Sequence, residues 1–153
     1  MTAFLHRLAC DERGNSFVEM ALLAPVFAAL LVSTADISRA YAARIELEQA
    51  AQRATERVQA IQYVEADKAD LKADAEAAAG TGAIATVTDW LQCGSSTTKK
   101  AYSDTCADGE AMARYVQVSI AKTYTPLFTK SVFKDRTSAG KVPLVGTSGV
   151  RVQ

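Results

Sequence analysis

The chain has little of several residue types on which common protein chemistries depend. It has 153 residues, of which one is histidine, His6, and aromatic residues make up only 7%. If a leader that contains His6 is removed, the product has no histidine, and the usual histidine-centred triads and metal clusters become unavailable. Alanine supplies much of the 49% hydrophobic content, which indicates a small core. We therefore expect no enzyme activity, no catalytic residues, no cofactor and no bound metal.

The chain also lacks an excess of either charge. Seventeen basic residues balance seventeen acidic ones, so the sequence has no basic footprint for nucleic acid, and we expect no such partner. Four acidic residues recur at helical spacing after residue 65, but the glycine and terminal glutamate of an EF-hand loop are missing. We interpret them as a solvated helix face: Asp67, Asp70, Asp74 and Glu76.

Glycine and proline are absent from Val26 to Ala79. Apolar and charged residues alternate at close to helical spacing after Ala35, which predicts one long helix from about Ser16 to about Tyr63. A heptad coiled coil is the alternative for its second half, although sustained Leu and Ile pairs are missing. Residues 65–79 predict a second helix, which Gly80-Thr81-Gly82 ends.

The residues from Met20 to Ala35 include no charged side chain. With Phe17 and Val18 they would form a helix of about 28 Å at about 1.5 Å per residue, which matches a hydrocarbon core of about 30 Å. Pro25 is tolerated in such a helix. Arg7 and Arg13 precede it, so the positive-inside rule predicts a cytoplasmic N-terminus and a C-terminal part on the other side.

Three interpretations of this segment compete. A secretory signal peptide would be cut after Ala40-Tyr41-Ala42, but Asp36 and Arg39 separate that site from the apolar run. An uncleaved signal anchor would keep Met1. A short leader, Met1–Gly14, would be removed so that Asn15 becomes the first residue and the apolar helix is retained. The mature N-terminus, Ala43, Met1 or Asn15, distinguishes the three.

Glu19 lies at the head of the apolar run, five residues after Gly14. A carboxylate inside a bilayer costs about 2.5–3.5 kcal/mol, less near the interface, so its presence there is a functional hypothesis by default. Cleavage after Gly14 would create an α-amine on Asn15, which the Glu19 carboxylate of a neighbouring subunit could neutralise. The alternative is that Glu19 reaches the lipid headgroups.

One of the three cysteines lies in the proposed leader, and the other two lie in the C-terminal half of the chain. Cys10 would leave with the leader, while Cys93 and Cys106 remain on either side of a mostly polar segment. We expect these two to form a disulfide, worth about 3 kcal/mol for a loop of this size, in an oxidising compartment. The alternative is a pair of free thiols in a cytosolic protein.

The C-terminal half turns to strand-forming composition. Strands are predicted at residues 84–92 and 115–124, with a last, interrupted strand at residues 142–145 and 148–152. Leu127–Phe133 is predicted to be a short helix or an irregular turn. Trp90 is expected in the core or at its rim, with a binding platform as the weaker interpretation. An antiparallel sheet laid on the long helix predicts an α+β fold.

Arg13-Gly14, Val18-Glu19-Met20 with its apolar run to Pro25, and Asp36-Ile37-Ser38-Arg39 together resemble the opening of TadE-like proteins. These are minor pilins or pseudopilins of the Tad (Flp) branch of type IV pili. Met20 replaces the usual aromatic residue after the glutamate. The resemblance implies a pilin-like fold, a processing site at Gly14 and Asn15, and an assembly role for Glu19.

The resemblance further implies three regions: a leader (residues 1–14), a transmembrane and assembly helix (15–36), and a periplasmic α+β domain (37–153). The implied location is the inner membrane, in a single pass, or the pilus. The implied partners are a prepilin peptidase, other pilin subunits and the Tad inner-membrane machinery, and the implied function is to prime, cap or help assemble an adhesive pilus. The alternative is a membrane-anchored periplasmic envelope adaptor that never enters a filament.

Overall fold

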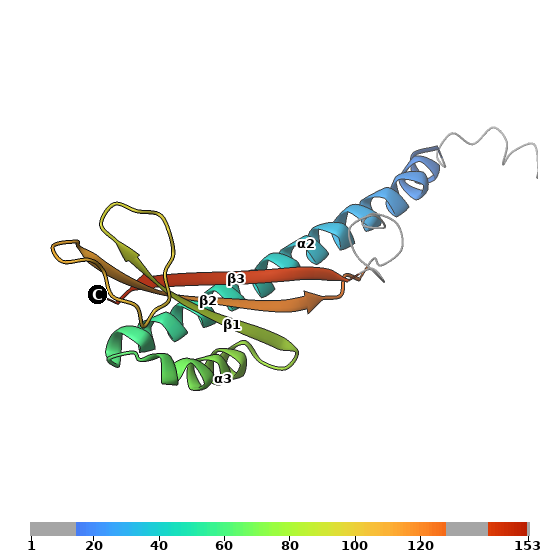
Figure 1. The fold of residues 1–153 in the computed structure, drawn as a ribbon. Coiled ribbons are helices and arrows are strands. Elements are labelled where there is room, and N and C mark those ends of the chain that lie inside the picture. Colours follow the sequence, from blue (N-terminus) through green and yellow to red (C-terminus); the bar gives the residue numbers. More distant parts are fainter. Residues whose placement is uncertain (1–14, 128–140, 153) are drawn as a thin grey trace, which may run out of the picture. The chain divides into compact units, whose positions relative to one another are not determined.

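The computed structural model describes residues 15–127 and 141–152. The Met1–Gly14 leader, with Gly14 itself, and residues 128–133 of the predicted Leu127–Phe133 turn lie outside them. Contacts divide the chain into two compact units, Met1–Ser38 and Arg39–Gln153. We call the second unit the sheet domain. The described elements are α2 (Asn15–Ala60), η2 (Glu65–Asp67), α3 (Lys68–Ala79), β1 (Ala83–Cys93), β2 (Met112–Tyr124) and β3 (Val142–Arg151) (Figure 1).

Helix α2 is continuous and contains Pro25. It ends at Ala60, slightly earlier than the predicted Tyr63, because Tyr63 leaves the helix and is buried in the core. Its ring makes an edge-on contact with Tyr102, at 5.4 Å between centroids. The Tyr63 side chain thus packs in the sheet domain beyond the end of the helix.

The sheet has the order β1-β2-β3, with both pairs antiparallel. One face of it packs on α2: three residues of β2, Val116, Val118 and Ile120, are fully buried together with Leu47, Ala51 and Val58 of α2. The predicted α+β fold, a long N-terminal helix on a small antiparallel sheet, is confirmed. Figure 1 shows the second half of α2 running along the sheet.

Helix α3 packs against β1 through Leu71 and Ala75. The sequence had indicated that the acidic residues of this helix are only solvated, but two of them form contacts with other elements. Asp74 forms an ion pair with Arg57 of α2, and Glu76 Oε1 accepts a hydrogen bond of 3.0 Å from the backbone N–H of Ala85. These contacts tie α3 to α2 and to the outer edge of β1.

The interruption predicted in the last strand is wrong. Strand β3 pairs with β2 continuously, and Gly146 lies opposite Ile120 in that register. Gly146 is buried against the backbone of α2, where a Cβ atom would lie 2.4 Å from the carbonyl carbon of Leu47. The glycine therefore allows close approach between strand and helix rather than breaking the strand.

Candidate assembly helix and its sheet domain

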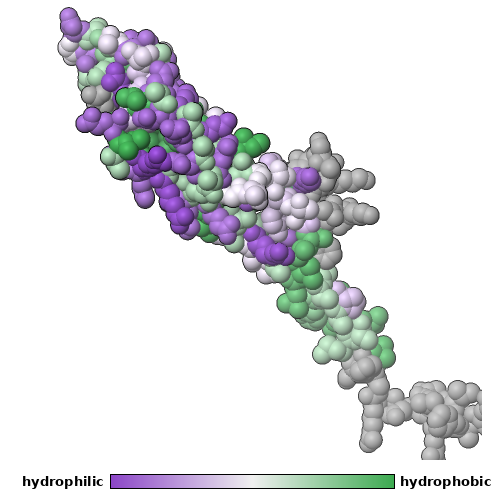
Figure 2. Space-filling model, turned by 90° about the horizontal axis from the view of Figure 1, so that it is seen from below, coloured by the Kyte–Doolittle hydropathy of each residue, from purple (hydrophilic) through white to green (hydrophobic). Residues whose placement is uncertain are grey.

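The first part of α2 presents an almost wholly exposed apolar surface. Leu22 is 70% exposed and Leu31 is 72% exposed. We call the following set the apolar surface: Val18, Met20, Leu22, Leu23, Val26, Phe27, Leu30, Leu31 and Val32. Figure 2 shows it as a hydrophobic stretch of the helix. Soluble monomers rarely expose apolar surface on this scale, and α2 is long and apolar enough to cross a membrane.

The hydroxyl groups of Ser33 and Thr34, in this part of α2, are satisfied within the helix. Ser33 Oγ donates to the carbonyl of Ala29, at 2.7 Å, and Thr34 Oγ1 donates to that of Leu30, at 2.9 Å. A polar group without a partner is costly in an apolar medium. Because these hydroxyls already have acceptors, burial of the apolar surface in lipid or in a helical bundle leaves them paired.

Glu19 lies in the first turns of α2, exposed among the apolar side chains Val18 and Met20. Asn15 begins the helix, and residues four apart lie on one side of an α-helix. The carboxylate of Glu19 is thus about one helical turn from an amine that cleavage would create at Asn15. Cleavage at Gly14-Asn15 and the assembly role of Glu19 both remain predictions.

Cys93 and Cys106 are joined by a disulfide in the structure. Cys93 is the last residue of β1 and is buried, whereas Cys106 lies in the loop that leads to β2. The bond therefore fastens that loop to the sheet. The Glu110 carboxylate lies within 4.8 Å of both sulfurs, but bonded sulfurs are not thiolate ligands.

Loss of the disulfide should destabilise the sheet domain. We expect reduction, or Cys93→Ser, to lower the free energy of unfolding by about 3 kcal/mol, because the unfolded chain gains the freedom of the opened loop. Denaturant unfolding with and without reductant measures this effect. Reductant should not change the Cys93→Ser variant further, and equal midpoints for oxidised and reduced wild-type protein would refute the prediction.

A buried polar cluster, which the sequence did not indicate, connects the end of α2, the start of α3 and β1. The side chain of Asp89 is only 4% exposed. Its Oδ1 accepts a hydrogen bond from Lys68 Nζ at 2.5 Å, and its Oδ2 accepts one from the Tyr63 hydroxyl at 3.2 Å. The Tyr102 hydroxyl donates to the Tyr63 carbonyl, at 3.2 Å. A carboxylate in the alternating pattern of a strand carries no signal of such partners, which are distant in sequence.

Burial, and then the Asp89 carboxylate, raise the pKa of the Tyr63 phenol above its ordinary 10.0. The folded protein therefore keeps this proton at a pH where the unfolded chain loses it. The stabilisation is complete below pH 10 and is lost as pH rises above it. We expect the free energy of unfolding to fall above pH 10, by less than about 1.4 kcal/mol per pH unit.

Alkaline denaturant titrations of wild type and Tyr63→Phe test this expectation. The phenylalanine variant should start less stable at pH 8 and should lose stability less steeply above pH 10, because it has no phenol at this position. Identical slopes would show that Tyr63 does not determine the alkaline loss.

One comparison with known proteins finds a match, and this match includes the apolar part of α2. No curated protein and no solved structure matches the chain. A family model, described as TadE-like protein, matches residues 14–56. The matched segment begins at Gly14, includes Glu19 and the apolar surface, and ends inside α2, so it does not extend into β1, β2 or β3. Over this segment, the chain is similar to TadE-like proteins.

Proposed function

We propose that the chain is a minor pilin or pseudopilin of a Tad-type pilus, which primes, caps or helps assemble the fibre. The match of residues 14–56 to the TadE-like family model supports involvement in the Tad pilus system. The observation that carries the proposal is the apolar surface of α2, exposed along the helix and headed by the single carboxylate of Glu19. A helix of this kind needs lipid or other apolar helices around it.

In this proposal the chain first lies in the inner membrane, with its N-terminus in the cytoplasm and residues 37–153 in the periplasm. Arg7 and Arg13 support that orientation, and the disulfide is compatible with an oxidising periplasm. A prepilin peptidase removes residues 1–14. The retained helix, residues 15–36, then joins the helices of other pilin subunits with the help of the Tad inner-membrane machinery.

In this proposal the Glu19 carboxylate determines the register in which neighbouring helices pack. The bilayer cost of the carboxylate falls when it faces the freed α-amine of Asn15 on a neighbouring subunit, because opposite charges attract strongly at low dielectric. The described residues around it, such as Val18 and Met20, are apolar, and apolar contacts are non-directional. A single ion pair would therefore select one register.

The second candidate function is a membrane-anchored envelope adaptor. It is favoured by one observation, that residues 57–153 lie beyond the segment that the family model matches. Such an adaptor would need the apolar helix but neither cleavage at Gly14 nor the carboxylate of Glu19.

Substitution at Gly14 separates the two functions. In cells that carry the complete pilus system, Gly14→Leu should block cleavage, so that the protein keeps its leader and few or no fibres form. As a control, the Cys10→Ser substitution changes another residue of the same leader, and the leader of this variant should be cleaved normally. Mass spectrometry of the membrane fraction and counting of surface fibres provide the two measurements. Normal fibres on cells whose protein keeps the leader would favour the adaptor.

A further inference from the structure

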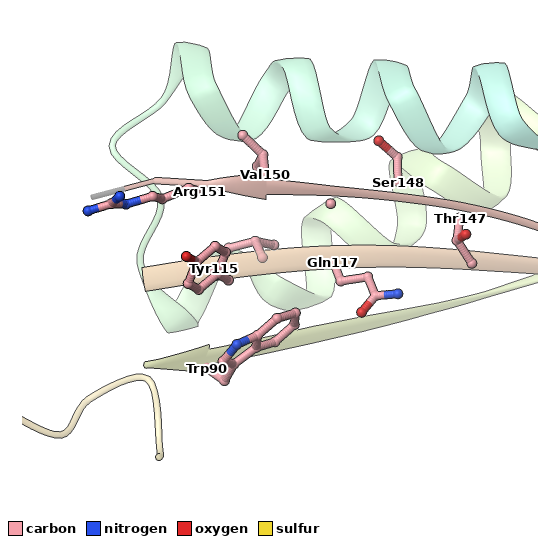
Figure 3. Close-up of a pocket in the computed structure, with 9 residues that line it drawn as sticks. Trp90, Tyr115, Gln117, Thr147, Ser148, Val150 and Arg151 are labelled. Atoms are coloured by element: carbon pink, nitrogen blue, oxygen red, sulfur yellow. The ribbon is translucent and has the colours of Figure 1, made fainter. Parts of the chain in front are cut away.

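The face of the sheet that points away from α2 and α3, which we call the outer face, has an unusual composition. It consists of alternate residues of β1, β2 and β3, and none of these outer positions is Asp or Glu. Hydroxyl groups recur along it, from Thr86, Thr88, Ser119 and Thr147. Figure 3 shows Trp90, Tyr115 and Gln117 on this side, while Ser148 and Val150 point towards α2.

A hollow of about 320 Å³ lies in the outer face. Gly149 pairs with Gln117 at this point and has no side chain to fill the space. Trp90, Tyr115 and Thr147 are among the residues that line it (Figure 3). Its volume is at the lower end of the range for small-ligand pockets, about 300–1,000 Å³.

The indole of Trp90 lies at the side of this hollow with an unmet donor. Its Nε1 is buried, and no acceptor contacts it within residues 15–127 and 141–152. A buried donor left unpaired costs about 1–3 kcal/mol. Tyr115 stacks on the indole, at 5.6 Å between centroids, and Lys99 Nζ lies 3.8 Å from the ring centroid. The lysine is the flexible member of this group, so it can move aside.

We propose that the hollow binds an acidic sugar unit of a surface polysaccharide. The lining residues supply hydrogen-bond donors, namely the indole N–H of Trp90, the amide of Gln117 and the hydroxyl of Thr147. Among the described residues that line the hollow, none carries a carboxylate that would repel an anion. The Lys99 ammonium can leave the indole and pair with the sugar carboxylate. Protein partners usually require a larger apolar centre than this hydroxyl-rich face offers.

Trp90 is the only tryptophan of the chain, so its fluorescence reports directly on the hollow. The full chain in neutral detergent micelles is titrated with oligogalacturonate, and in parallel with a maltooligosaccharide of equal length. Oligogalacturonate should change the Trp90 emission in a saturable way as Lys99 moves from the ring. The neutral sugar should bind at least about tenfold more weakly. Equal responses, or no saturable response to either sugar, would overturn the proposal.

Four variants test whether the sugar binds in the hollow. Gly149→Thr should fill the hollow and weaken binding at least about tenfold with the fold intact, because a Cβ there meets only ordinary contacts, of 3.6 Å or more. Trp90→Phe, followed by calorimetry, should weaken binding because it removes the donor. Lys99→Gln should weaken binding, whereas Lys100→Gln, its matched neighbour, should not. Unchanged binding by Gly149→Thr, or equal losses for the two lysine variants, would overturn the proposal in favour of non-specific charge attraction.

Discussion

Gly146→Ala is expected to lower the free energy of unfolding of the sheet domain by about 3 kcal/mol, the upper part of the range for overpacking. A Cβ at this position would lie 2.4 Å from the carbonyl carbon of Leu47 and 2.5 Å from the backbone nitrogen of Glu48. Backbone atoms in the middle of a helix cannot rotate away as a flexible side chain can. Strand β3 or helix α2 must therefore shift, which disturbs the buried contacts of Val118 and Ile120.

The matched control for this substitution is Gly149→Ala in the same strand. A Cβ there would have its nearest neighbour at 3.6 Å, so the change should be within about 0.5 kcal/mol of wild type. Denaturant unfolding followed by circular dichroism compares the two variants. Equal free energies of unfolding for Gly146→Ala and Gly149→Ala would show that β3 does not approach the backbone of α2 closely at Gly146.

Glu19→Gln should permit synthesis, membrane insertion and cleavage, yet reduce surface fibres by at least about tenfold. The substitution keeps the size of the side chain and removes the charge that the neighbouring α-amine would need. Loss of this pairing leaves a costly amine in an apolar medium, and about 1.4 kcal/mol already corresponds to a tenfold change in an equilibrium. Fibre counts, with the membrane level of the protein measured in parallel, test this.

Two controls restrict the interpretation of the Glu19 experiment. Glu56→Gln removes an exposed carboxylate from the other end of α2 and should leave fibre number unchanged. Glu19→Asp keeps the charge and should retain part of the assembly. Normal fibre numbers for Glu19→Gln would count against the pairing of carboxylate and amine, and would favour contact of Glu19 with lipid headgroups.

The sequence was sufficient to predict the helix and the general fold, because those follow from local patterns. The absence of glycine and proline from Val26 to Ala79 predicted a long helix, and α2 and α3 occupy most of that range. The strict alternation of Val116, Val118 and Ile120 predicted β2, and all three side chains are fully buried. Periodicity identifies buried faces because the side-chain direction repeats with the backbone.

What the sequence could not indicate are contacts between residues distant in the chain. Gly146 resembles a strand breaker until the backbone of Leu47 is placed against it. Asp89 shares the inward register of Val87 and Leu91, but the sequence does not show that Lys68 and Tyr63 would pair with its two oxygens. Both depend on the way that α2 and α3 lie on the sheet, which no local pattern encodes.

The intact mass of wild-type protein extracted from membranes of its own cells is the most direct test of the account. We predict the mass of Asn15–Gln153 with one disulfide, because residues 1–14 are removed and the apolar helix is kept. The mass of the full Met1–Gln153 chain would contradict leader removal, and that of Ala43–Gln153 would contradict retention of the helix.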